Sequence, residues 1–188
     1  MFQKFYPDLY VSSTYEIDFD RLYRSGYRGL IFDIDNTLVT HGAPANDQAK
    51  QLFAHLHEIG FATCLISNNQ EPRVKPFADA VHSLYIYDAH KPSTKNYEKA
   101  MEQMHTEKGN TIFIGDQMFT DVFGANRTGI PSIMVKKIHW KEEIQIVLKH
   151  IKKIFFYPRF VARFDATKRG VLHMGEIIFQ EGMKQWNP

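Results

Sequence analysis

Two aspartates, Asp33 and Asp35, stand two residues apart directly after a short apolar run of the chain. In an extended backbone this spacing puts both carboxylates on the same side, where their charges repel each other. A divalent cation or a shared proton would relieve the repulsion, so the pair is suited to metal binding or to acid–base chemistry. The alternative is a solvated strand end with no catalytic role, and the pair alone leaves both interpretations open.

Further polar residues follow three later apolar runs of the chain. They are Ser67 with Asn68, then Lys91, then Asp116 with Asp121 five residues on. Each has an ordinary structural explanation, as a turn serine, a solvated lysine or a helix-capping aspartate. Together they put a phosphate- or metal-binding group after each of four apolar runs, which is typical of the ligand-binding edge of a parallel sheet.

Apolar runs alternate with helix-like segments between residues 28 and 135. The clearest helix covers 46–59, where apolar residues recur at 3.6-residue spacing between a capping Asn46 and Gly60. We expect strands over 28–34, 61–67, 84–89, 111–115 and 132–135, and helices over 46–59, 71–81, 93–104 and 120–128. Pro76 could distort the helix over 71–81. The alternation predicts an α/β, Rossmann-like fold, with a parallel sheet between two helical layers.

In their order along the chain, these motifs resemble the four motifs of the haloacid dehalogenase (HAD) superfamily, from about residue 29 to residue 135. The matching residues are Asp33-Ile34-Asp35-Asn36-Thr37, Ser67, Lys91 and the stretch from Gly115 to Asp121. The resemblance implies a phosphatase in which Asp33 is the nucleophile and Asp35 the general acid and base. It also implies that Ser67, Lys91 and the backbone N–H of Asn68 bind the phosphoryl group.

The same resemblance implies a Mg²⁺ cofactor. The carboxylates of Asp33 and Asp116, with the main-chain carbonyl of Asp35, would supply the hard oxygen ligands that this ion prefers. Asp121 would support Lys91 or a metal-bound water. Thr37 would brace the loop that follows the first strand.

The spacing of the motifs leaves no room for a cap domain, because only 34 residues separate Asp33 from Ser67 and 24 separate Ser67 from Lys91. A capless site is open, so either another subunit closes it or the substrate is itself large. The strings at 5–8 and 15–18, together with the missing cap, resemble the YqeG group of HAD subfamily IIIA. That group is similar to phosphatases of phosphatidylglycerophosphate, which implies this compound or another large or lipid phosphate as the substrate.

Three other functions are compatible with parts of the sequence. The enzyme could act on a soluble sugar phosphate or nucleotide, or the chain could be a catalytically retired HAD-like protein that binds RNA or ribosomes. A receiver domain of a signalling relay also uses an aspartate, a hydroxyl group and a lysine, but in a different order. The presence of all four motifs favours the enzyme, and nucleic acid is not expected as a partner.

The charge of the chain is unevenly distributed. The net charge is +2, yet residues 136–169 hold ten Lys or Arg against three acidic residues, which leaves −5 for the remainder. Within this basic part, residues 141–164 interleave aliphatic, aromatic and basic side chains. We expect this amphipathic segment either to contact an anionic membrane surface or to pack on the core.

We therefore divide the chain into a lead-in segment (1–27), a phosphatase core (28–140), the amphipathic segment (141–164) and an unassigned tail (165–188). The single cysteine, Cys64, lies in an apolar run, which favours a core position and a reducing compartment. No signal peptide and no run of about 18 apolar residues is evident in the sequence. These features predict a cytoplasmic protein that is at most peripheral to the inner face of the membrane.

Overall fold

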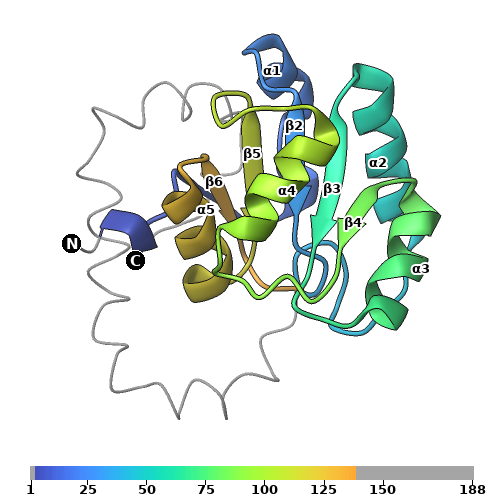
Figure 1. Ribbon diagram of the computed structural model, residues 1–188. Coiled ribbons are helices and arrows are strands. Elements are labelled where there is room, and N and C mark those ends of the chain that lie inside the picture. The colour runs from blue at the N-terminus through green and yellow to red at the C-terminus, as the bar shows by residue number, and fades with distance from the viewer. Residues whose placement is uncertain (1–2, 139–188) are drawn as a thin grey trace, which may run out of the picture.

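A computed structural model describes residues 3–138, which form one sheet of six strands with helices on both faces (Figure 1). The strand order across the sheet is β1-β6-β5-β2-β3-β4, and every neighbouring pair is parallel. The strands are β1 (Leu9–Val11), β2 (Gly29–Phe32), β3 (Ala62–Ile66), β4 (Leu84–Ile86), β5 (Thr111–Gly115) and β6 (Ser132–Val135). The predicted parallel sheet is therefore confirmed.

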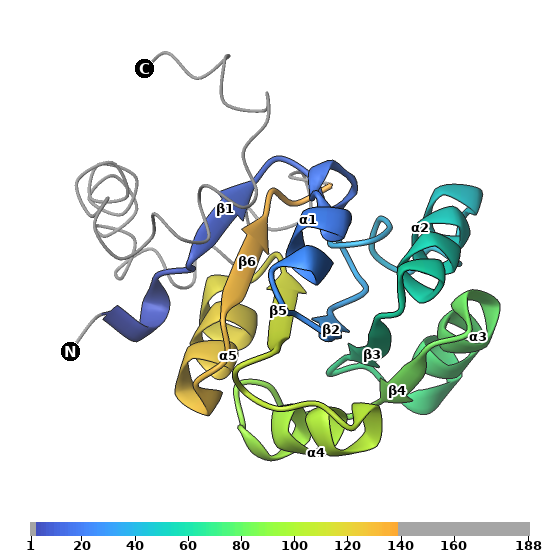
Figure 2. The same ribbon diagram turned by 90° about the horizontal axis from the view of Figure 1, so that it is seen from above.

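The described part also contains five α-helices and three shorter helical turns. They are α1 (Phe19–Arg24), α2 (Asp47–Ile59), α3 (Glu71–Val81), α4 (Lys95–Met104) and α5 (Phe123–Thr128), with η1 (Gln3–Phe5), η2 (Thr14–Glu16) and η3 (Met118–Val122). Seen from above, α1, α2 and α3 lie on one face of the sheet, and α4 and α5 lie on the other (Figure 2). This confirms the three-layer α/β architecture.

The strands are apolar on both faces because each face is covered by helices. In β2, Leu30 and Phe32 belong to the core shared with α1, α2 and α3, whereas Ile31 belongs to the core shared with α4 and α5. Cys64 of β3 also lies in the second core, where burial raises the pKa of its thiol to about 12. A sheet buried on both sides explains why the strands are continuous apolar runs rather than alternating ones.

Helix α2 forms where the sequence predicts it, because both of its ends are capped. The Asn46 side chain accepts a hydrogen bond from the Ala49 N–H at 2.8 Å, and Gly60 ends the helix with a φ of 107°. Helix α3 continues to Val81 through Pro76, whose ring lies on the exposed side. Pro76 therefore does not end the helix.

The segment expected as a lead-in contributes to the sheet and to the core. Strand β1 pairs with β6, and the Ser132 N–H donates to the Asp8 carboxylate at 2.8 Å. Leu9 and Leu22 are both fully buried. A three-residue edge strand is too short to show a pattern in the sequence, which is why it was not predicted.

The two motif intervals are occupied by ordinary elements of the fold. Helix α2 and strand β3 fill the chain between Asp33 and Ser67, and α3 and β4 fill the chain between Ser67 and Lys91. Within residues 3–138, no helix combines the length and apolar character that crossing a bilayer requires. The amphipathic segment (141–164) and the tail (165–188) lie outside the described residues.

Candidate active site

The candidate catalytic residues meet at one edge of the sheet, where the strands end. Asp33 follows β2, Ser67 follows β3 and Asp116 follows β5, and these three strands are neighbours in the sheet. Lys91 reaches the same edge from the loop after β4 and contacts Asp33. All four side chains are buried, as expected of groups gathered at the carboxyl ends of parallel strands.

Lys91 joins two of the carboxylates. Its Nζ donates to Asp33 Oδ1 at 2.6 Å and to Asp121 Oδ1 at 2.7 Å. The side-chain amide of Asn68 fixes the main chain of Lys91. Its Oδ1 accepts from the Lys91 N–H at 2.7 Å, and its Nδ2 donates to the Lys91 carbonyl at 3.3 Å. The ammonium group is therefore held beside the predicted nucleophile.

Asp121 is brought to Lys91 by a π-helical turn. In η3 the Val122 N–H donates to the Gln117 carbonyl at 3.2 Å, five residues back, and such turns are frequent at functional sites. The Gln117 N–H donates to Asp121 Oδ2 at 3.0 Å. Gly115 permits this approach, since a Cβ at that position would lie 2.5 Å from the same oxygen.

Asp116 is fully buried and only partly satisfied by the protein. Thr37 Oγ1 donates to its Oδ1 at 3.1 Å, which links the first motif to the fourth. The other oxygen, Oδ2, has no hydrogen-bond partner among residues 3–138, and the Lys137 ammonium lies 3.6 Å away. A buried carboxylate oxygen in this state is suited to a cation.

The carboxylates of Asp33, Asp116 and Asp121 form a compact acidic cluster whose ligand oxygens lie within 4.8 Å of one another. Burial raises the pKa of Asp33 to about 6, against the lowering effect of Lys91. Burial, and then the charges of Asp121 and Asp33, raise the pKa of Asp116 to about 8. Three oxygen ligands with excess negative charge fit a hard divalent cation such as Mg²⁺.

The charge of Lys91 is secured by its neighbours. Burial alone would lower the pKa of this amine, but the carboxylates of Asp121 and Asp33 outweigh it and raise the pKa above its usual value. Lys91 is therefore a permanent positive charge inside the site at physiological pH.

Asp35 lies at the same edge but outside the acidic cluster. Its Oδ1 accepts from the Gly42 N–H and from Arg73 Nη2, both at 2.8 Å, and its Oδ2 accepts from Asn69 Nδ2 at 2.7 Å. The ligand expected from Asp35 is its main-chain carbonyl, and that role stays a prediction. In the acidic cluster, the third carboxylate comes from Asp121, for which the family resemblance implies a supporting role.

The phosphate-binding candidates follow β3. Ser67 is buried, and its Oγ accepts a hydrogen bond from the Asn69 N–H at 3.1 Å. Asn68 is exposed at the edge, and binding of phosphate by its backbone N–H stays a prediction.

Three residues of the site were not anticipated. Arg73 and Asn69 contact Asp35, and Lys137 lies near Asp116. No motif includes them, and in the sequence Lys137 stands out only as one of the basic residues of 136–169.

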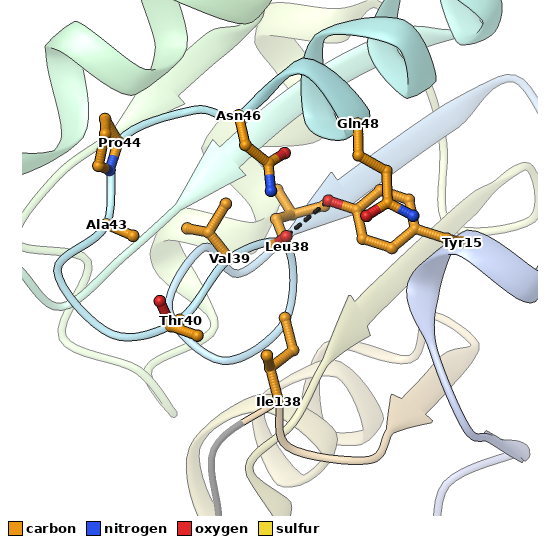
Figure 3. Close-up of a pocket in the computed structure, with 9 residues that line it drawn as sticks. All are labelled: Tyr15, Leu38, Val39, Thr40, Ala43, Pro44, Asn46, Gln48 and Ile138. Atoms are coloured by element: carbon orange, nitrogen blue, oxygen red, sulfur yellow. Dashed lines mark hydrogen bonds between the residues drawn. The ribbon is translucent and has the colours of Figure 1, made fainter.

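A cavity of about 300 Å³ lies beside the site. Figure 3 shows the side chains of Leu38, Val39 and Ile138 around it. The Tyr15 hydroxyl donates a hydrogen bond to the Leu38 carbonyl at 2.5 Å. Leu38 and Ile138 directly follow Thr37 and Lys137, the two residues that lie against Asp116. Two of the residues that line the cavity are therefore chain neighbours of residues that lie against Asp116, and most of the lining side chains are apolar.

Comparisons with known proteins identify the family to which the chain is similar. A family model described as HAD-hydrolase-like matches residues 89–143. The probable phosphatase YqeG of Bacillus subtilis is 37% identical over 137 residues, which cover 72% of this chain and 80% of that protein. Phosphatidylglycerophosphate phosphatase 1 of Arabidopsis thaliana, chloroplastic/mitochondrial, is 22% identical over 151 residues, which cover 75% of this chain and 43% of that protein.

A solved structure of a hypothetical protein from Xanthomonas campestris has the same fold. It superposes with a TM-score of 0.51 at 17% identity, over 66% of this chain and 73% of that one. The match to YqeG extends over most of both chains, and the four motif groups lie together at one edge of the sheet. The chain belongs to the HAD superfamily, as a phosphatase of the YqeG family.

Proposed function

We propose that this phosphatase is a Mg²⁺-dependent phosphomonoester hydrolase that works through an aspartyl-phosphate at Asp33. The observation that carries the proposal is the buried acidic cluster, in which Lys91 bridges Asp33 and Asp121 while Asp116 Oδ2 has no hydrogen-bond partner within residues 3–138. Phosphoryl transfer depends mainly on positioning and on stabilisation of negative charge. A fixed carboxylate beside a fixed ammonium group supplies both.

The proposed reaction has two steps. An oxygen of Asp33 attacks phosphorus, the bond from phosphorus to the leaving oxygen breaks, and Asp35 gives its proton to that oxygen. In the second step Asp35 takes a proton from water, whose oxygen attacks phosphorus. The bond from phosphorus to Asp33 then breaks, which releases phosphate and restores both carboxyl groups.

Mg²⁺ is the cofactor that the site fits. Asp33 and Asp116, with the main-chain carbonyl of Asp35, would hold it, and the acidic cluster offers Asp121 as a further carboxylate. When bound, the ion would neutralise charge on the phosphoryl oxygens. Lys91 would also neutralise charge on the phosphoryl oxygens and would favour the ionised form of Asp33.

We infer that the substrate is phosphatidylglycerophosphate or another large or lipid phosphate. Three observations support this substrate class. The intervals between the motifs hold only ordinary elements of the sheet, a largely apolar cavity adjoins the site, and one relative is named as a phosphatidylglycerophosphate phosphatase. An open site with an apolar neighbour is suited to a phosphate that is presented on a bulky apolar body.

A panel of phosphate esters tests the substrate class. Phosphate release would be measured with Mg²⁺ from phosphatidylglycerophosphate in detergent micelles, from glycerol phosphate, from sugar phosphates and from nucleotides. We expect the lipid to have the highest kcat/KM. Faster hydrolysis of a sugar phosphate or nucleotide would replace the lipid with a soluble substrate and leave the phosphatase assignment in place.

Asp33→Asn tests the covalent mechanism. The amide keeps the shape of the side chain and loses the nucleophile, so turnover should fall by at least about 10⁴-fold while the circular dichroism spectrum is unchanged. Rapid acid quenching of the wild type with ³²P-labelled substrate should trap label on the protein. Turnover in Asp33→Asn near that of the wild type would rule out covalent catalysis at this residue.

A further inference from the structure

The carboxylate of Asp35 is held by donors that none of the four motifs supplies. Gly42 and Arg73 donate to one oxygen at 2.8 Å, and Asn69 donates to the other at 2.7 Å. The Asp35 side chain is 9% exposed and that of Arg73 is 21% exposed, so the ion pair is largely shielded from solvent. Both oxygens have partners, which fixes the plane of the carboxyl group.

Arg73 is itself anchored by its helix. It lies in the first turn of α3, where its N–H donates to the Gln70 carbonyl at 3.0 Å. Its guanidinium lies 5.7 Å from the centre of the Phe77 ring, one turn further along, and Phe77 is buried. The helix therefore determines where the guanidinium can reach. Its hydrogen bond to Asp35 joins two charged groups, and such bonds are stronger than those between neutral groups.

Asn69 connects Asp35 to the phosphate-binding loop. Its N–H donates to Ser67 Oγ at 3.1 Å, and its carbonyl accepts from the Asp88 N–H at 2.9 Å. Two hydrogen bonds of its main chain thus fix Asn69, whose side-chain amide holds Asp35. A shift of this loop would displace Asp35 and Ser67 together.

We infer that Arg73 and Asn69 are positioning residues for Asp35, and that they hold its carboxyl group where a proton can pass between it and the leaving oxygen or the attacking water. This inference rests on the proposed function, in which Asp35 is the acid and base. Within residues 3–138, the hydrogen bond that the Arg73 guanidinium makes goes to Asp35. Arg73 therefore acts on the reaction through Asp35, with no contact of its own to the acidic cluster.

A double-mutant cycle on Arg73→Ala and Asp35→Asn tests this dependence. Turnover would be measured with Mg²⁺ and p-nitrophenyl phosphate, whose leaving group needs no proton, so that Asp35→Asn impairs only the second step and its residual turnover can be followed through the coloured product. We expect Arg73→Ala to lower kcat by about 10- to 100-fold in the wild-type background, with KM little changed. In the Asp35→Asn background its effect should shrink to less than about twofold.

The leaving group supplies a second readout. Glycerol phosphate leaves as an alkoxide that must be protonated, so Arg73→Ala should slow its hydrolysis more than that of the aryl ester. Arg73→Lys keeps the charge but has a different donor geometry, and we expect it to recover part of the loss. A merely structural role of Arg73 would slow both esters by the same factor.

Arg28→Ala is the matched control. The Arg28 guanidinium also stacks on an aromatic ring, at 3.9 Å from the centre of Tyr23, and donates to two main-chain carbonyls. It lies just before β2, at the opposite end of the strand from Asp33, so kcat should stay within about twofold of the wild type. If Arg73→Ala does not fold, the same double-mutant cycle can be measured with Asn69→Ala, which removes the donor to the other oxygen of Asp35.

The outcomes separate the inference from the proposed function. If Arg73→Ala lowered kcat by the same factor in the wild-type and Asp35→Asn backgrounds, or did not lower it at all, the positioning role would be overturned. Asp33→Asn judges the covalent mechanism independently, because that substitution should be inactive whatever residue occupies position 73. An inactive Asp33→Asn combined with an equal loss in both backgrounds would therefore overturn only the role of Arg73.

Discussion

Asp116 has the environment that depends most on a cation. It is fully buried, its Oδ2 lacks a hydrogen bond among the described residues, and its pKa is raised to about 8. The burial of an incompletely paired carboxylate destabilises the fold, and a bound divalent ion would reverse that effect. Binding of Mg²⁺ to the native state alone should therefore stabilise the protein against unfolding.

We expect Asp116→Asn to abolish this stabilisation. In the wild type, Mg²⁺ at about 100 times its Kd should add about 2.7 kcal/mol to the free energy of unfolding, measured by urea denaturation with Mg²⁺ and with EDTA. The asparagine variant should unfold at the same urea concentration in both buffers. Asp88→Asn is the control, because Asp88 lies in the loop after β4 as an exposed residue paired with His90 and should leave the Mg²⁺ response intact. A full response in Asp116→Asn would remove this residue from the metal site.

At the residue scale, the sequence predicted the groups that follow strands and missed the groups that hold them. Asp33, Lys91 and Asp116 could be foreseen at one place because parallel strands end at one edge. Arg73 could not, since it reaches Asp35 from a helix 38 residues later and its sequence neighbours form no motif. Such partners are set by the direction of a helix relative to the sheet, which only the tertiary structure specifies.

Strand β1 is the element whose importance the sequence concealed. Leu9 is fully buried in the core beneath α1, although its strand has only three residues and lies at an edge. We expect Leu9→Ala to lower the free energy of unfolding by about 2–5 kcal/mol, the range for a buried leucine, in urea denaturation.

The opposite edge of the sheet supplies the control. Leu84 begins β4, also a three-residue edge strand, but is 43% exposed. Leu84→Ala should therefore change the free energy of unfolding by less than about 1 kcal/mol. If the two variants were equally stable, β1 would not be an integral part of the core.

The elements that the sequence predicted well are those with two kinds of signal. Helix α2 has an apolar periodicity and caps at both ends, and it was found to within one residue. The segment over 120–128 was predicted as one helix, whereas the structure has the π-helical turn η3 followed by α5. The turn follows from the contact between Asp121 and Lys91, which local propensity does not encode.

For the whole molecule, the distribution of charge predicts a membrane contact. Residues 136–169 carry a net +7, and most of them lie outside the described residues. We propose that this basic part docks the open site on an anionic bilayer, where each basic residue contributes about 1 kcal/mol near the surface. Sedimentation with liposomes should show binding that rises with the fraction of anionic lipid and falls with salt.

Two sets of four substitutions separate this contact from a general effect of charge. Replacement of Arg159, Arg163, Lys168 and Arg169 by Ser should weaken liposome binding. Replacement of four exposed lysines of the core, Lys50, Lys95, Lys99 and Lys108, changes the net charge equally and should leave binding intact. Equal weakening by both sets, or binding that ignores lipid charge, would argue against the membrane contact.

The pairing of β1 with β6 also sets the order of events during synthesis. The bond between Asp8 and Ser132 joins residues 124 positions apart, so β1 leaves the ribosome long before its partner exists. At about 5–20 residues per second, β1 waits roughly 6–25 seconds for its neighbour. Strand β1, the first of the described strands to be made, is thus the last to join the sheet. Its pairing with β6 is a contact of very high sequence separation, and such contacts slow folding.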